Sequence, residues 1–231
     1  MAATRAMASA MTATTPAKKR TAILISGRGS NMMSLVEAAR ARDFPADIVA
    51  VISNRPDAAG IAWAKAQGIA TQIIDHNAFK SRETFETELD KGLAAAKPDI
   101  VALAGFMRIM TPGFVARWQD RMINIHPSLL PNFKGLHTHE QALAAGVKIA
   151  GCTVHFVRAE MDAGPIIAQA AVPVLSGDTP VTLAARVLAA EHKLYPAALR
   201  LVASGRVRCE ADKVTILEDV NASGPLCSPL C

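Results

Sequence analysis

The strongest constraint on the fold is a regular alternation of short apolar runs with segments of helical spacing. Four apolar runs are separated by stretches in which apolar residues recur every three to four positions: "TAILIS", "DIVAVIS", "IATQII" and "DIVALAG". This β-α-β-α order favours parallel strands, and strands covered on both faces read as continuous apolar runs. The sequence therefore predicts an α/β fold: a three-layer, Rossmann-like, mostly parallel sheet with helices on both faces.

The remainder of the chain extends this pattern without an internal repeat or a linker. We expect strands at "RMINIH", "AGCTVHFV" and "PIIAQAAVPV", a short helix at "HTHEQALAAG", a long helix over residues 179–205, and a terminal hairpin made of "RVRCE" and "KVTILE". The sequence predicts one domain over residues 21–218. Residues 1–20 are expected to be a disordered extension and residues 219–231 a flexible tail.

Composition argues against several classes of protein. The 231 residues carry a net charge of +5, and the basic residues are scattered among only 4% aromatics, which disfavours a nucleic-acid platform. No apolar run reaches the length of a membrane span. The four cysteines form no CxxC pair, so we expect reduced thiols in a cytoplasmic protein rather than a disulfide framework or a zinc ribbon.

The loop "SGRGSN" follows the first predicted strand, at the edge where open α/β sheets bind ligands. Its two glycines allow close backbone approach, and a helix N-terminus with free N–H groups follows at once. Met32 replaces the third glycine of dinucleotide sites, so the pattern suits a single phosphate rather than a pyrophosphate. A glycine turn followed by an ordinary helix cap explains the pattern about equally well.

The stretch "NIHPS" ends a strand in which Asn124 and His126 point to the same side. A carboxamide can stabilise a developing oxyanion, and an imidazole can transfer a proton near neutral pH. A carboxylate beside this ring, such as Asp162 in "RAEMDAGP", would orient it. For each residue alone, a structural role remains open: a histidine satisfying the backbone at a strand end, or an aspartate in a turn.

Two further stretches allow more than one interpretation. The loop "GFMRIM" could grip a flat heterocycle or simply pack into the core. His137 and His139 are two residues apart, which points them to different faces of a helix, and no further ligand lies at suitable spacing. We therefore expect no metal site here and interpret this segment as one that shapes a substrate pocket.

Taken together, these motifs resemble one family. Seven of them follow one another in its order, over roughly Thr21 to Gly205: "ISGRGSN", "AGFMRI", "NIHPSLLP", "GLHTHEQAL", "TVHFV", "DAGPII" and "EHKLYP". The chain thus resembles the phosphoribosylglycinamide formyltransferases. The resemblance implies a metal-free transfer of a formyl group from 10-formyltetrahydrofolate, the co-substrate, to the glycine amine of glycinamide ribonucleotide in de novo purine synthesis. It implies small-molecule partners only, for a monomer or homodimer.

The resemblance also implies roles for individual residues. The catalytic residues would be Asn124, His126 and Asp162. The ribonucleotide would be bound by Gly29, Ser30, Asn31 and Glu191. The folate would be bound by Arg82, Met107, Arg108, Ile109, Met110, Asn124, Arg158, Ala159, Glu160, Met161 and Asp162. Two positions depart from the family pattern: Arg28, where Asn is common, and Leu188, where a polar substrate contact is common.

Three alternatives remain. Methionyl-tRNA formyltransferase shares the Asn-x-His and "SLLP" features but carries an additional RNA-contacting domain, for which this chain is too short. Formyltetrahydrofolate deformylase shares the catalytic trio but adds an N-terminal regulatory domain that twenty residues cannot form. A nicotinamide-binding Rossmann protein would need an acidic residue closing the second strand, where this sequence has Ser53 and Asn54.

Overall fold

The computed structural model describes residues 17–210 and 212–217. At its centre lies a seven-stranded sheet, which in spatial order contains β3 (Thr71–Ile73), β2 (Ala46–Ser53), β1 (Lys19–Ile25), β4 (Ile100–Leu103), β5 (Met122–His126), β6 (Ile149–Phe156) and β7 (Ile166–Pro173). Neighbours from β3 to β5 are parallel, whereas β6 and β7 pair antiparallel. The predicted α/β class with a mostly parallel sheet is confirmed.

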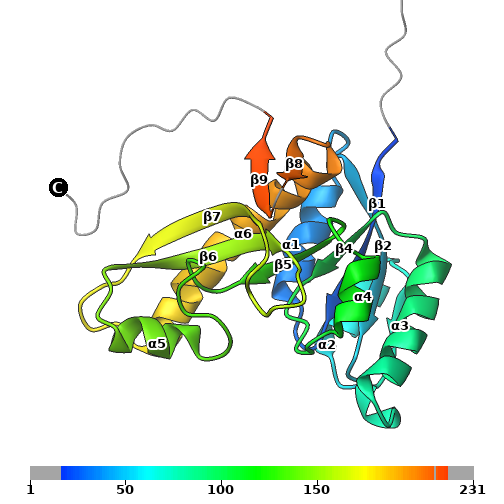
Figure 1. Cartoon of the computed structure of the whole chain (residues 1–231), viewed down its shortest axis with the longest axis horizontal. Coiled ribbons are helices and arrows are strands. Elements are labelled where there is room, and N and C mark those ends of the chain that lie inside the picture. The colour runs from blue at the N-terminus through cyan, green and yellow to red at the C-terminus, as the bar shows by residue number, and fades with distance from the viewer. Residues whose placement is uncertain (1–16, 211, 218–231) are drawn as a thin grey trace, which may run out of the picture.

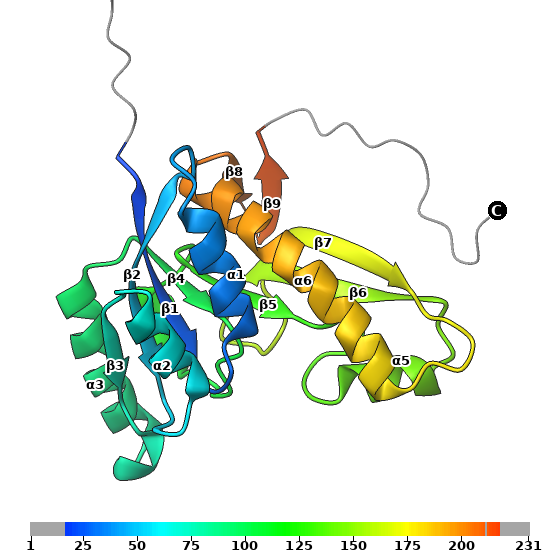
Figure 2. The ribbon, with the colours of Figure 1, turned by 180° about the vertical axis from the view of Figure 1, so that it is seen from behind.

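Helices cover both faces of the sheet (Figures 1 and 2). One face packs against α1 (Ser30–Ala39), α2 (Ala59–Ala66) and α6 (Pro180–Ala203). The other packs against α3 (Arg82–Ala96) and α4 (Pro112–Arg117). Strand alternation divides the core accordingly: in β1, Ile23 and Ile25 face the first layer, whereas Ala22 and Leu24 face the second. All four side chains are fully buried.

Local sequence signals explain where several helices begin. Ser81 and Thr179 each form a capping box at the start of α3 and α6, and Pro180 occupies the first helical position of α6. Two short helices were not predicted: α4, and the single 3-10 turn η1 (His76–Ala78). Strand β1 begins at Lys19, two residues before the predicted start of the domain. Within the described residues, no helix combines the length and apolarity needed to cross a membrane.

The 24-residue helix α6 runs along both parts of the sheet. Its first half packs Leu183 and Val187 against β6 and β7, which extend away from the parallel strands (Figure 2). Its second half buries Tyr195, whose hydroxyl lies 3.0 Å from the carbonyl oxygen of Leu103 and 3.2 Å from that of Ile123. One helix therefore joins the parallel strands to the antiparallel extension.

The remaining elements lie at the edges of the sheet. Helix α5 (Thr138–Ala144) packs under β6, and the predicted hairpin is present as β8 (Val207–Glu210) and β9 (Lys213–Ile216), beside β7 (Figure 1). Residues 1–16 and 218–231 lie outside the described residues, so the predicted extension and tail fall almost wholly there.

Candidate active site

A cleft of about 830 Å³ opens at the carboxyl ends of β4 and β5, where the sheet topology directs ligands. It contains most of the residues that the sequence singled out: Asn31, Met107, Arg108, Ile109, Met110, Asn124, His126, Arg158, Ala159, Met161, Asp162 and Glu191. Four others lie outside its lining: Gly29, Ser30, Arg82 and Glu160. Arg82 is exposed at the start of α3, and Glu160 is exposed and pairs with Lys134 at 3.0 Å.

At one end of the cleft, His126 and Asp162 approach each other. The Nδ1 atom of His126 lies 3.4 Å from Oδ2 of Asp162, although the two residues come from β5 and from the loop that follows β6. The same carboxylate oxygen accepts a hydrogen bond from the N–H of Gly135 at 2.9 Å, which fixes its orientation. Asp162 has a left-handed φ of 52°, so its backbone is held in an uncommon conformation to reach this position.

The second ring nitrogen of His126 is also engaged. Its Nε2 lies 3.0 Å from the carbonyl oxygen of Phe133, an acceptor, so Nε2 carries the proton in this arrangement. The ring is 5% exposed. With Asp162 at Nδ1, both ring nitrogens face acceptors. A ring held in this way can donate a proton to a substrate.

Asn124 is oriented by a residue that sequence reasoning did not include in the site, His155. The two residues are directly opposite in the antiparallel pair of β5 and β6, and Asn124 Nδ2 lies 3.2 Å from His155 Nε2. Nδ1 of His155 lies 3.0 Å from the carbonyl of Phe156, so Nδ1 carries the proton and Nε2 accepts from the amide. Burial lowers the pKa of His155, which keeps it a neutral acceptor.

At the other end, the loop between β1 and α1 presents main-chain groups. Gly29 precedes α1 with a φ of 71° and offers no side chain to cap the helix. The N–H groups of the first helical turn therefore have no partner within the helix. Helix α2 supports this loop closely, because a Cβ on Gly60 would stand 3.1 Å from the carbonyl oxygens of Gly27 and Arg28.

Asn31 and Glu191 meet across this end of the cleft. Asn31 Nδ2 donates to Glu191 Oε2 at 2.6 Å, and both side chains are buried. Burial raises the pKa of Glu191, and the hydrogen bond from Asn31 opposes that shift. Asn31 Oδ1 is buried without a partner among the described residues. A ligand carrying hydroxyl groups would supply the donor that this oxygen lacks.

The apolar loop of residues 105–110 is fixed at two points. Ser26 Oγ accepts a hydrogen bond from the N–H of Met107 at 2.7 Å and donates to Asn54 Oδ1 at 2.5 Å. The buried carboxylate of Glu86 accepts from the N–H of Thr111 at 2.6 Å. The exposed side chains of this loop, such as Met107 with 64% exposure, form an apolar rim with room for a flat ring.

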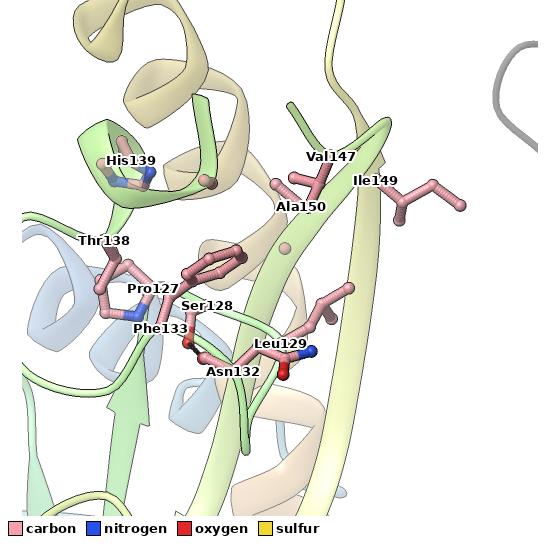
Figure 3. A pocket seen from close by; sticks show the side chains of 12 residues that line it. Pro127, Ser128, Leu129, Asn132, Phe133, Thr138, His139, Val147, Ile149 and Ala150 are labelled. Carbon is pink, nitrogen blue, oxygen red and sulfur yellow. Dashed lines mark hydrogen bonds between the residues drawn. The ribbon is translucent and has the colours of Figure 1, made fainter. Parts of the chain in front are cut away.

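The two neighbouring histidines differ in their surroundings. His137 is exposed and lies 3.5 Å from Glu140. His139 lines both the cleft and a smaller side pocket of about 60 Å³ between residues 127–133, helix α5 and the start of β6 (Figure 3). Burial lowers the pKa of His139. Among the described residues, no group of three or more His, Cys, Asp or Glu side chains is arranged to hold a metal ion.

Comparison with known proteins identifies the family of the chain. Residues 19–199 match the family described as "Formyl transferase". The chain therefore belongs to the formyl transferase family, as its sequence motifs indicated. Within that family it is similar to the phosphoribosylglycinamide formyltransferase of Escherichia coli (strain K12), with 46% identity over 80% of this chain and 88% of that protein.

Solved structures and longer relatives extend the comparison. The phosphoribosylglycinamide formyltransferase structure from Brucella melitensis is 56% identical, with a TM-score of 0.78 over 81% of this chain and 97% of that one. The bovine trifunctional purine biosynthetic protein adenosine-3 is 54% identical over 84% of this chain, which spans 19% of that longer protein. A formyltetrahydrofolate deformylase from Pseudomonas syringae shares the fold at 28% identity, with a TM-score of 0.82 over 88% of this chain and 67% of that one.

Proposed function

We propose that this chain transfers the formyl group of 10-formyltetrahydrofolate to the glycine amine of 5-phosphoribosylglycinamide, giving formylglycinamide ribonucleotide and tetrahydrofolate in purine synthesis. The observation that carries the proposal is one continuous cleft with an acid–base group and an oriented carboxamide at one end and an uncapped helix N-terminus near the other. The names of the relatives that match the chain over most of their length support the same reaction.

The catalytic steps follow from the side chains at the β5 end. The amine attacks the formyl carbon, a C–N bond forms, and the formyl oxygen becomes an oxyanion. Asn124 uses one Nδ2–H on His155 and has its second Nδ2–H to stabilise that oxyanion. The bond from the formyl carbon to the folate nitrogen then breaks, and this nitrogen receives a proton as the amine loses one. These steps need no metal ion and no covalent enzyme intermediate.

His126 is the proton carrier in this scheme. Its Nε2–H lies against the carbonyl of Phe133, so the substrate oxygen or the leaving nitrogen must replace that carbonyl as the acceptor. Asp162 lies 3.4 Å from the opposite ring nitrogen, Nδ1, and orients the ring so that its Nε2–H can serve as the proton donor. Residues 127–137, which include Phe133, therefore connect substrate entry with proton transfer.

The ribonucleotide occupies the end formed by β1, α1 and α6. The N–H groups of Ser30 and Asn31 bind its phosphate, helped by the helix dipole and by the absence of a side chain at Gly29. Asn31 Oδ1 and Glu191 accept hydrogen bonds from the sugar hydroxyls, which would satisfy the buried oxygen left unpaired in the protein.

The folate occupies the apolar end. Its flat ring fits beside the rim of residues 107–110, in a part of the cleft that is also lined by Arg158, Ala159, Met161 and Asp162. Arg108 lies over the ring of Phe85, with its Cζ 5.8 Å from the ring centroid, and Arg82 at the start of α3 is a further positive charge on this side. We assign these cations to the acidic tail of the cofactor, for which opposite charge gives attraction at a solvated rim.

The measurement that tests this function is release of tetrahydrofolate from the formyl donor, with and without glycinamide ribonucleotide. Release only in the presence of the ribonucleotide supports the transferase. Release without it would instead identify a deformylase, the activity named for a structural neighbour. No release under either condition would contradict both.

A cytoplasmic location and a monomeric or dimeric state remain predictions. Size-exclusion chromatography with light scattering would decide the oligomeric state.

Asp162→Asn tests the catalytic assignment directly. The amide preserves the size of the side chain but removes the charge beside Nδ1 of His126, 3.4 Å away. We expect lower activity and a changed pH profile. An unchanged profile would remove Asp162 from the mechanism.

A further inference from the structure

The C-terminal hairpin β8–β9 is joined to the wall of the cleft by Arg158. This residue is the second after β6, near the start of the loop of residues 157–164, which carries Asp162. Although it belongs to a surface loop, its side chain is only 18% exposed. The hairpin itself lies beyond residues 19–199, the part of the chain that matches the family.

The guanidinium of Arg158 contacts three separate segments. Its Nε donates to Asp212 Oδ1 in the hairpin turn at 3.0 Å, and its Nη2 donates to Asp120 Oδ1, before β5, at 2.7 Å. Nη2 also lies 3.3 Å from Cys209 Sγ in β8, and Nη1 donates to the carbonyl of Val157 at 3.2 Å. Four of the five N–H groups of a guanidinium therefore have protein acceptors.

Because its guanidinium is already bonded to protein acceptors, Arg158 is not available to bind a folate directly. Burial opposes the charge, but the carboxylates of Asp120 and Asp212 outweigh it and raise the pKa, so the group stays charged and paired. An arginine that binds a ligand carboxylate needs two free N–H groups on one edge of its planar guanidinium, and here the N–H groups are occupied by protein acceptors. The contribution of Arg158 to the cleft is therefore its backbone and its aliphatic stem.

The same loop is closed tightly at its base. The N–H of Val157 donates to the carbonyl of Met122 at 2.9 Å, and that of Phe156 donates to Pro165 at 2.9 Å. Gly164 passes so close that an added Cβ would stand 1.7 Å from the Phe156 carbonyl oxygen and 3.3 Å from Cγ of Arg158. The Arg158 stem is thus packed between the outgoing and returning chains, four residues before Asp162.

We propose that Arg158 is a positioning residue: it anchors the loop of residues 157–164 to the hairpin β8–β9 and to Asp120, and thereby places the Asp162 carboxylate against His126. Asp212 in the hairpin turn then acts on the position of Asp162 through Arg158, although Asp212 itself does not line the cleft. This inference rests on the proposed function for its catalytic consequence, whereas the anchoring of the loop stands independently of it.

Two variants test the anchor, and one serves as a matched control. Arg158→Lys keeps the charge but cannot reach both carboxylates with a planar fork. Asp212→Asn removes one charge at a side chain that is 77% exposed, so it poses little risk to folding. The control is Glu210→Gln, which breaks an ion pair of 3.5 Å with Arg208 in the same hairpin without touching the loop.

Steady-state kinetics should separate positioning from general destabilisation. A misplacement of a catalytic group by about 1 Å can reduce the rate by about 100-fold, so we expect Arg158→Lys to lower kcat/KM for the formyl donor by about 10- to 100-fold. The KM for the ribonucleotide, bound at the opposite end, should not change. Asp212→Asn should show the same pattern more weakly, and Glu210→Gln should match the unaltered protein.

The double variant sharpens the result. If both residues act through one contact, Arg158→Lys combined with Asp212→Asn should be little worse than Arg158→Lys alone. Equal effects on both substrates, or full additivity, would instead indicate a loss of stability unrelated to positioning and would overturn the proposal.

Hydrogen–deuterium exchange provides a readout that does not depend on activity. We expect faster exchange across residues 157–164 in Arg158→Lys and Asp212→Asn, but not in Glu210→Gln. Unchanged exchange in the first two would refute the anchor, whatever the kinetics. If the unaltered protein transfers no formyl group, the proposed function fails, while the exchange experiment still decides whether Arg158 holds the loop.

Discussion

The two ends of the cleft obtain their polar groups in different ways. At the proposed ribonucleotide end, the loop between β1 and α1 offers main-chain N–H groups, and Gly29 there adopts a left-handed backbone conformation. At the proposed folate end, the groups are side chains from β5, β6 and the following loop: Asn124, His126, His155 and Asp162. An end built from main chain should tolerate changes of side chain, whereas an end built from side chains should not.

The largest effect should come from His126→Ala. General acid–base catalysis contributes about 10²- to 10⁴-fold, so we expect kcat to fall within that range while the KM values change little. Steady-state assays with both substrates measure this, and thermal unfolding of the variant is the control for folding. A loss below about tenfold would show that another group carries the proton.

The next effect should come from His155→Leu, which removes the acceptor that orients Asn124. Loss of an oxyanion donor costs about 10²- to 10³-fold, and a misoriented amide should approach the lower value. His155→Gln keeps an acceptor at a similar position and should restore part of kcat. If both variants lose the same activity, orientation of the carboxamide is not the role of His155.

At the other end, Glu191→Gln tests an exception, because Glu191 is a side chain that we assign to ribonucleotide binding at an end otherwise made of main-chain groups. Hydrogen bonds to charged groups contribute about 1.5–3 kcal/mol, so the KM for the ribonucleotide should rise by about tenfold or more, with the folate KM unchanged. The neutral amide can keep the contact with Asn31 through its carbonyl oxygen. An equal rise in both KM values would argue against a local contact.

The same variant has a predictable effect on stability. Burial raises the folded-state pKa of Glu191 above its ordinary value of 4.5, so the native state binds the proton more tightly than the unfolded chain. As pH rises from about 4.5 through the raised pKa, this group lowers the free energy of unfolding. Glu191→Gln should therefore be more stable than the parent near pH 7, and the difference should disappear below pH 4.5. Denaturant titrations at several pH values provide the check.

The smallest effect is expected for Arg28→Ala. Arg28 lies in the proposed phosphate loop, where we assign phosphate binding to main-chain N–H groups, and an exposed charge contributes little. We expect a change of less than about threefold in the KM for the ribonucleotide, from a contribution below about 1 kcal/mol. A loss as large as that of Glu191→Gln would break the comparison, since a side chain would then dominate at the main-chain end as well.

The sequence predicted the strands and most of the helices, because apolar runs and helical spacing are local properties of the chain. Helix α4 was missed because six residues give too short a periodic signal. The pairing of Asn124 with His155 was also out of reach, because strand patterns identify strands but do not give the register of an antiparallel pair. The acceptor on His126, the Phe133 carbonyl, belongs to the backbone and has no sequence signal.

Arg158 illustrates a different limit of prediction from sequence motifs. The family resemblance assigns it to the folate site, and it does line the cleft. Its guanidinium, however, is bound by partners 38 and 54 positions away, one of them in a hairpin outside the family match. A motif can give the position of a residue in a loop, but only the folded chain shows which atoms of that residue are free for a ligand.

Helix α6 has a mechanical consequence. It packs along the antiparallel extension with Leu183 and Val187, and it reaches strands β4 and β5 through Tyr195, so it ties the two parts of the sheet to each other. A displacement of β6 and β7 relative to β4 and β5 would break the packing at one half of α6, so the helix resists that displacement.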